Sequence, residues 1–253
     1  MSSIDQLRIK LFADGADLEQ VTALSRNPLI TGFTTNPTLM HKAGVKDYRD
    51  FARAFLALSG SKPVSFEVFS DEFEEMEQQA REIASWGEPV YVKIPVTNTQ
   101  GLFAGPLIGR LAVAGVKVNV TAIMTLEQVK QVAAHLSDRT PSILSVFAGR
   151  IADTGRDPVP MMAEAVQLLK AHPRAELLWA SPRELLNVFQ ADAVGCQIIT
   201  ATSDVLAKLS LVGKDLDQFS LETVQMFRRD AVKAGLTLTN AEGSKLEAVG
   251  EIV

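Results

Sequence analysis

The strongest constraint on the fold is an alternation of short apolar segments with amphipathic segments that repeats eight times along the chain. Each apolar segment is rich in β-branched residues, which is typical of strands buried in a parallel sheet. The segments between them carry apolar residues at helical spacing. The expected strands are 9–14, 31–35, 64–69, 89–97, 117–123, 142–147, 175–180 and 197–201.

Eight strand–helix units without a linker or low-complexity break predict an α/β protein that folds as a (β/α)8 TIM barrel. A doubly wound open sheet is the alternative, but such sheets seldom alternate so evenly. We expect one domain over residues 1–253, with 215–253 as a C-terminal helical extension. The expected helices are 17–26, 47–59, one from 71, 99–114, 125–136, 158–171, 184–190, 204–211 and, outside the repeat, 221–234.

Composition restricts the kinds of partner and the compartment. The net charge of -5 gives no basic surface for nucleic acid or an anionic membrane, whereas a phosphorylated substrate needs only a local arginine cluster. The single cysteine, Cys196, excludes an internal disulfide framework and fits a reducing cytosol. The chain starts without a signal-peptide apolar region and has no apolar run of the ~18 residues that a membrane span needs. We therefore expect a cytoplasmic protein.

Polar residues end nearly every expected strand. In a (β/α)8 barrel the active site lies at the carboxyl ends of the strands, so these residues predict a polar cavity lining. Side chains alternate along a strand. Asn119 and Thr121 therefore share one face of their strand, and Ser145 and Phe147 share one face of theirs. The strand-end polar residues are Asp14, Thr34, Asn36, Glu67, Lys93, Asn119, Thr121, Ser145, Ser181 and Arg183.

Lys93 is the most informative of these residues because it lies inside the apolar strand 89–97. Lysine is almost never fully buried unless it is paired, and a buried ammonium tends to lose its proton to become a nucleophilic amine. Alternatively, a lysine at a strand end reaches water and has no chemical role. Glu67 is also costly inside an apolar strand, whereas Asp14 alone is compatible with a turn. Their convergence at one barrel mouth favours catalysis.

The combination of Lys93, Asp14 and Glu67 permits Schiff-base chemistry. A neutral lysine adds to a ketone, and the Schiff base that forms withdraws electrons so that an adjacent carbon–carbon bond can break. Two carboxylates with different pKa values would move protons on and off the hydroxyl groups. Arg150 and Arg183 follow the sixth and seventh expected strands and would hold a phosphate through their planar guanidinium groups.

The same residues lie in segments that resemble the transaldolase family, which includes the fructose 6-phosphate aldolases. The resemblance runs in order from about residue 10 to 200, and its lysine and Asn-Pro motifs together are highly specific. The matching segments are Phe-Ala-Asp at 12–14, Gly-Phe-Thr-Thr-Asn-Pro-Thr at 32–38, Val-Lys-Ile-Pro-Val-Thr at 92–97, Asn-Val-Thr at 119–121, Ser-Val-Phe-Ala-Gly-Arg-Ile at 145–151 and Ala-Ser-Pro-Arg at 180–183.

The resemblance also implies roles for single residues. Lys93 is implied to be the Schiff-base lysine and Asp14 the acid/base for the substrate hydroxyls. Glu67 with Thr121 is implied to handle the catalytic water, and no metal or organic cofactor is implied. The implied substrate-binding residues are Thr34, Asn36, Asn119, Ser145 and Phe147, with Arg150, Ser181 and Arg183 at the phosphate.

The resemblance implies a transaldolase, which moves a dihydroxyacetone unit from a ketose phosphate (fructose 6-phosphate or sedoheptulose 7-phosphate) to an aldose phosphate. One alternative is an aldolase that uses free dihydroxyacetone, and another is a non-catalytic barrel used for binding. At positions 67 and 147 the chain resembles transaldolases, because it has Glu67 and Phe147 where the aldolase branch tends to carry glutamine and tyrosine.

The compact length resembles branches of the family that assemble into rings, so a homo-oligomer is expected, with a pentamer or decamer as candidates. Two residues depart from the family pattern beside the expected phosphate site. Pro182 replaces the usual aromatic residue, and Trp179 stands where a small residue is common.

Overall fold

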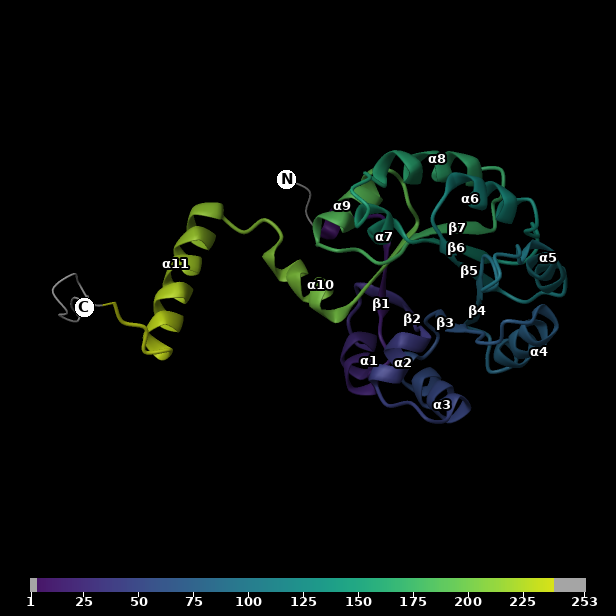
Figure 1. Cartoon of the computed structure of the whole chain (residues 1–253), viewed down its shortest axis with the longest axis horizontal. Coiled ribbons are helices and arrows are strands. Elements are labelled where there is room, and N and C mark those ends of the chain that lie inside the picture. Colours follow the sequence, from purple (N-terminus) through teal and green to yellow (C-terminus); the bar gives the residue numbers. More distant parts are fainter. Residues whose placement is uncertain (1–3, 239–253) are drawn as a thin grey trace. The chain divides into compact units, whose positions relative to one another are not determined.

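The computed structural model describes residues 4–238, and eight parallel strands in it form one closed barrel (Figure 1). Strands that are neighbours in the chain pair in the sheet, and β8 pairs with β1 to close it. This confirms the predicted (β/α)8 barrel and excludes the open sheet. The strands are β1 (Lys10–Asp14), β2 (Ile30–Thr34), β3 (Val64–Glu67), β4 (Val90–Pro95), β5 (Val118–Ile123), β6 (Ser142–Val146), β7 (Ala175–Trp179) and β8 (Ile198–Ala201).

Helices cover the outside of the barrel (Figure 1). The main core joins outward-facing strand residues such as Val92 and Val120 to helix residues such as Leu111 and Val129. A smaller cluster that includes Phe12 packs on the opposite faces of the strands. The helices are α1 (Leu18–Ser25), α2 (Pro37–Lys42), α3 (Tyr48–Ser59), α4 (Phe73–Ala84), α5 (Gly105–Val113), α6 (Leu126–Ala133), α7 (Ala148–Ala152), α8 (Val159–Leu169), α9 (Leu186–Ala193), α10 (Ser203–Ala207) and α11 (Leu216–Lys233), with short 3-10 helices η1 (Ile4–Gln6) and η2 (Lys208–Leu211).

The helix expected from residue 99 begins instead at Gly105. The side-chain oxygen of Asn98 accepts a hydrogen bond from the backbone N–H of Leu102 at 2.9 Å, which folds this segment into a turn. Pro106 then stands in the first turn of α5, where a missing N–H costs nothing. The residues after β4 therefore form a loop at the barrel mouth.

Thr125 caps α6, and Gln128 completes the capping box. The short helix α7 was not predicted, because its five residues are too few to show helical periodicity. Arg150 lies in this helix, which follows the carboxyl end of β6 along the chain.

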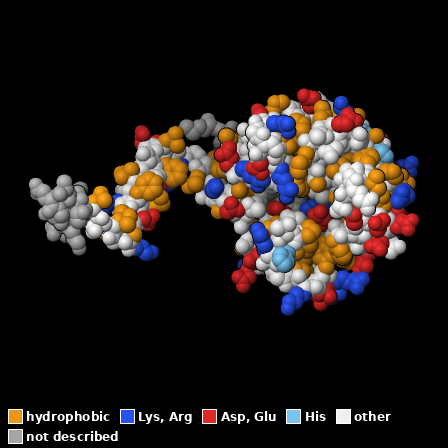
Figure 2. Space-filling model, in the orientation of Figure 1, with side chains coloured by type: hydrophobic (Ala, Val, Ile, Leu, Met, Phe, Trp, Pro, Cys, Tyr) orange, Lys and Arg blue, Asp and Glu red, His pale blue; other side chains and the backbone are white. Residues whose placement is uncertain are grey.

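The described chain divides into two compact units, one up to Ser210 and one from Leu211 onward. In the second unit α11 begins at Leu216, earlier than predicted, because the Asp215 side chain caps it by accepting from the backbone N–H of Gln218 at 2.9 Å. No side chain of α11 is buried, and Figure 2 shows apolar side chains exposed along it. The extension over 215–253 stays a prediction, and 239–253 lie outside the described residues.

Every helix in residues 4–238 is too short or too polar to cross a membrane.

Candidate active site

A cavity of about 460 Å³ is lined by residues from the carboxyl ends of the strands and the loops that follow them. Ten of the twelve predicted site residues line it, so the structure brings most of them together. The two that do not are Asn119 and Arg183. The ten are Asp14, Thr34, Asn36, Glu67, Lys93, Thr121, Ser145, Phe147, Arg150 and Ser181.

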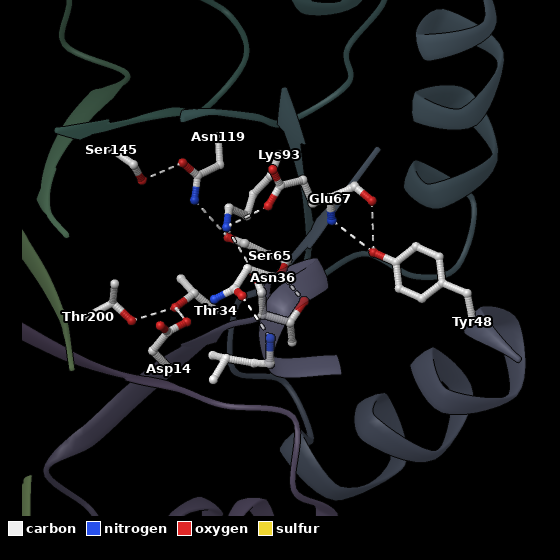
Figure 3. A network of polar contacts seen from close by, with 12 residues as sticks. Asp14, Thr34, Asn36, Tyr48, Ser65, Glu67, Lys93, Asn119, Ser145 and Thr200 are labelled. Atoms are coloured by element: carbon white, nitrogen blue, oxygen red, sulfur yellow. Dashed lines mark hydrogen bonds and ion pairs between the residues drawn. The ribbon is translucent and has the colours of Figure 1, made fainter. Parts of the chain in front are cut away.

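Lys93 projects from β4 into this cavity and is 6% exposed. The parallel register of β3 and β4 places Glu67 directly beside it. The Lys93 Nζ atom lies 3.0 Å from Glu67 Oε2 and donates a hydrogen bond to the Thr35 carbonyl oxygen at 2.8 Å (Figure 3). The buried amine is thus paired, as burial of lysine requires. The Glu67 carboxylate is close enough to exchange a proton with it.

Asp14 ends β1 and accepts a hydrogen bond from one threonine hydroxyl, which is bonded in turn to a second threonine. Thr34 Oγ1 donates to Asp14 Oδ1 at 2.8 Å, and Thr200 Oγ1 lies 2.5 Å from Thr34 Oγ1 (Figure 3). A hydroxyl has one proton to give, so Thr200 must donate to Thr34 when Thr34 donates to Asp14. The Thr34 proton therefore points to the Asp14 carboxylate, and the Thr200 proton points to the Thr34 oxygen.

The surroundings of Asp14 suit an acid/base. Burial raises the pKa of Asp14 above its ordinary value of 3.8, although the charge of Lys93 and the hydrogen bond from Thr34 oppose the rise. Burial in a low-dielectric site disfavours the ionised carboxylate, and here this effect is the larger one. A raised pKa lies closer to neutral pH, where a carboxyl group can both give and accept a proton.

Asn119 does not line the cavity. It is fully buried in β5, its Nδ2 donates to Ser65 Oγ at 3.0 Å, and its Oδ1 accepts from Ser145 Oγ at 2.6 Å. These two bonds fix the direction of the amide, and through it the hydroxyl of Ser145. Ser145 itself lines the cavity, so the structure places Asn119 where it orients a lining residue.

Asn36 and Thr121 bring further polar atoms to the cavity. Asn36 caps α2, because its Oδ1 accepts from the backbone N–H of Leu39 at 2.9 Å. The Thr121 hydroxyl is buried and has no hydrogen-bond partner within residues 4–238. Such a group costs free energy unless a ligand satisfies it, which marks the hydroxyl as a contact for substrate or water.

Two residues that line the cavity have a left-handed backbone although neither is glycine. Ala122 has φ of 61° where the β5–β6 register shifts, and Ser181 has φ of 59° after β7. Strained backbone of this kind clusters at functional sites. Close packing accompanies it, because a Cβ added at Gly149 would meet the Ser181 carbonyl oxygen at 1.5 Å.

The two predicted phosphate-binding arginines differ in position. Arg150 lines the cavity, and its guanidinium carbon lies 5.2 Å from the centre of the Phe147 ring. Arg183 instead grips the Asp153 carboxylate with Nε, at 2.9 Å from Oδ1, and with a second nitrogen. This pair is half-exposed, and its hydrogen bonds lower the pKa of Asp153.

A second cavity of about 280 Å³ adjoins the first, because Asp14, Ser181 and Thr200 line both. Arg183 and Pro182 line only the second one. Trp179, expected beside the phosphate site, is fully buried in the main core and lines neither cavity. Alternation along β7 explains this, because Leu178 belongs to the other core cluster and Trp179 faces away from it.

Comparison with known proteins places the chain in a family. The sequence model of "Transaldolase/Fructose-6-phosphate aldolase" matches residues 11–247. The chain belongs to this family. The transaldolase/fructose-6-phosphate aldolase family is also the one that the segments around Lys93 and Asn36 resemble, so the predicted family is confirmed.

Two curated relatives are similar over most of their length, and a solved structure shares the fold. A "Probable transaldolase" from Methanococcus maripaludis is 34% identical over 202 residues, which cover 79% of this chain and 89% of that protein. One from Dehalococcoides mccartyi is 32% identical over 202 residues, covering 79% and 90%. A crystal structure from Burkholderia cenocepacia J2315 superimposes with a TM-score of 0.59 at 14% identity, covers 88% of this chain and 84% of that chain, and shows the fold alone.

Two residues of the polar network were missed by the sequence analysis. Ser65 supports Asn119, and Thr200 supports Thr34. Both lie inside strands, whereas the predicted site residues were those at strand ends. Alternation would have found Ser65, because it stands two residues before Glu67 on the same face of β3.

Proposed function

We propose that the protein is a transaldolase that transfers a dihydroxyacetone unit through a Schiff base on Lys93. The donor is a ketose phosphate, fructose 6-phosphate or sedoheptulose 7-phosphate, and the acceptor is an aldose phosphate. The observation that carries the proposal is the buried Lys93–Glu67 pair in a cavity that also holds Asp14. Membership of the family supports it.

The first step would form the Schiff base. Glu67 takes a proton from Lys93, whose neutral amine then attacks the ketone carbon of the donor. Loss of the ketone oxygen as water leaves an iminium, and Glu67 with the Thr121 hydroxyl is suited to guide that water because both line the cavity beside Lys93.

The second step would break the carbon–carbon bond. Asp14 accepts the proton of the hydroxyl group on the far side of this bond, and the bonding electrons move into the iminium to give an enamine on Lys93. The shortened aldose phosphate leaves with a new aldehyde group. The enamine then attacks the aldehyde of the acceptor, Asp14 returns the proton, and water releases the new ketose phosphate.

Transfer is proposed in preference to aldolase action because Phe147 lines the cavity and has no phenol that could protonate the enamine carbon. An enamine that is not protonated persists until an acceptor arrives. We expect fructose 6-phosphate alone to give about one cleavage per active site, and erythrose 4-phosphate to restore steady turnover. Sustained release of free dihydroxyacetone without an acceptor would instead establish the aldolase alternative. Absence of turnover in both assays would favour the non-catalytic barrel.

Arg150 is expected to contribute more to phosphate binding than Arg183. Arg150 lines the cavity, whereas Arg183 is held by Asp153 outside the main cavity. Loss of a charge-assisted hydrogen bond should raise KM for the phosphorylated donor about 10- to 100-fold in Arg150→Ala. Arg183→Ala should raise KM less than about fivefold, because the Arg183 guanidinium is already bonded to Asp153 and does not line the main cavity.

The comparison is made by steady-state kinetics, with Arg53→Ala on the outer helix α3 as the control. An equal or larger effect of Arg183→Ala would contradict this ranking and assign the phosphate to the second cavity.

The remaining proposals concern partners and location. We infer that the small-molecule partners are sugar phosphates, that the reaction uses no cofactor, and that the enzyme acts in the cytoplasm without nucleic acid or membrane. We also propose a homo-oligomer, with a ring-type pentamer or decamer as the candidates, in which exposed apolar side chains of α11 such as Val224 and Phe227 meet another copy.

A further inference from the structure

The carboxyl end of β3 extends beyond its neighbour β2. Strand β2 pairs with β3 only as far as Thr34 opposite Ser65, and the chain then turns into α2. Backbone groups of alternate residues point to the same side of a strand. The carbonyl of Ser65 faces β2, where Thr35 N–H bonds it at 3.1 Å, so the N–H and carbonyl of Glu67 also face that side. Within residues 4–238, no strand pairs with these two groups on that side.

Tyr48 occupies the place of the missing strand. Its hydroxyl accepts a hydrogen bond from the Glu67 N–H at 2.8 Å and donates one to the Glu67 carbonyl oxygen at 3.0 Å (Figure 3). One phenol therefore satisfies both backbone groups, which would be costly to leave unpaired. Burial raises the pKa of Tyr48, which keeps this hydroxyl protonated as the donor bond requires.

The ring of Tyr48 is itself fixed by other aromatic rings. It packs edge-on against Trp86 at 5.2 Å between centroids and against Phe66 at 6.2 Å. Tyr48 is the first residue of α3, where an aspartate, Asp47, caps the helix. The phenol is thus anchored in the helix layer, outside the cavity, and reaches the strand end with little freedom.

We propose that Tyr48 is a positioning residue that holds the Glu67 carboxylate at the Lys93 amine by pinning the Glu67 backbone. The Glu67 carboxylate lies 3.0 Å from Lys93 Nζ, and proton transfer at this distance is sensitive to displacement of either group. Tyr48 does not itself line the cavity, and its hydroxyl contacts the lining residue Glu67 through the backbone. This inference rests on the proposed Schiff-base function.

The test compares Tyr48→Phe with Tyr91→Phe, which changes the other tyrosine of the chain. Tyr91 lies on β4 and lines a different cavity, so it controls for loss of a phenol. Tyr48→Phe keeps the ring and removes the hydroxyl. We expect kcat to fall about 10- to 100-fold with KM within about twofold, because geometry at the reacting groups is lost and substrate contacts are not. Tyr91→Phe should keep kcat within about twofold.

A double-mutant cycle separates positioning from simple stabilisation. If Tyr48 acts through Glu67, Tyr48→Phe should change kcat by less than about twofold in the Glu67→Gln background. A full effect of Tyr48→Phe in that background, or wild-type kcat in Tyr48→Phe alone, would overturn the inference. Should Tyr48→Phe fail to fold, hydrogen exchange of the wild-type Glu67 amide is the second test. Protection comparable to that of core strands is expected, and rapid exchange would overturn the inference.

Failure of the two proposals can be told apart. If borohydride and fructose 6-phosphate give no adduct on wild-type Lys93, the proposed function fails. If the adduct forms and Tyr48→Phe behaves as wild type, only the role of Tyr48 fails.

Discussion

Lys93→Met is expected to abolish transfer, lowering kcat at least about 10⁴-fold, the order of loss seen when a covalent nucleophile is removed. Methionine fills a similar apolar volume but has no amine to form a Schiff base. The substitution also leaves Glu67 without its cationic partner in the cavity. Removing one member of a buried ion pair is strongly destabilising, by about 3–5 kcal/mol where burial is complete. Glu67 is 18% exposed, so we expect a smaller loss of stability.

Two controls separate lost chemistry from lost stability. The double variant Lys93→Met/Glu67→Gln removes both charges and should recover much of the thermal stability while remaining inactive. Lys117→Met removes a lysine whose partner Glu88 is exposed, and it should retain activity. Activity of Lys93→Met within tenfold of wild type would contradict the mechanism whatever its stability.

Asp14→Asn is expected to lower kcat about 10²- to 10⁴-fold, the usual contribution of a general acid/base. Asparagine can still accept the hydrogen bond from Thr34 but cannot move a proton. The same substitution should raise the melting temperature at neutral pH. The pKa of Asp14 is raised in the folded protein, so the folded state holds the proton more tightly than the unfolded state. Folding stability from this group therefore falls as pH rises through the raised pKa.

The pH dependence checks this reasoning. Below the ordinary value of 3.8 the carboxyl group is protonated in both states, so the difference in melting temperature between Asp14→Asn and wild type should become small. Above the raised pKa the difference in melting temperature should be constant, with Asp14→Asn melting at the higher temperature. Thermal unfolding followed by circular dichroism from acid to neutral pH measures it. A variant that is less stable than wild type at neutral pH would show that the charge of Asp14 stabilises the fold.

The alternation of strands and helices was sufficient to predict the barrel, because parallel strands buried on both faces leave a strong apolar signal. It also placed ten site residues at one cavity, since the carboxyl ends of all eight strands meet at the same end of a barrel. The pairing of β3 with β4 places Glu67 opposite Lys93. The distance between the Lys93 amine and the Glu67 carboxylate comes from the structure.

The rest depends on contacts between residues far apart in the chain. Nothing in the local sequence shows that Asp153 binds Arg183, or that Ser145 lines the cavity and Asn119 does not. The contribution of Tyr48 depends on where β2 leaves the sheet. Side-chain pairing of this kind is decided by three-dimensional packing, which periodicity does not encode.

The most direct test of Schiff-base transfer is borohydride reduction of the wild-type protein in the presence of fructose 6-phosphate, followed by mass spectrometry of its peptides. Reduction should fix the bound dihydroxyacetone or ketose unit as a stable secondary amine on the peptide that carries Lys93, and Lys93→Met should give none. An unmodified Lys93 peptide, or an adduct on another lysine, would contradict the proposed mechanism.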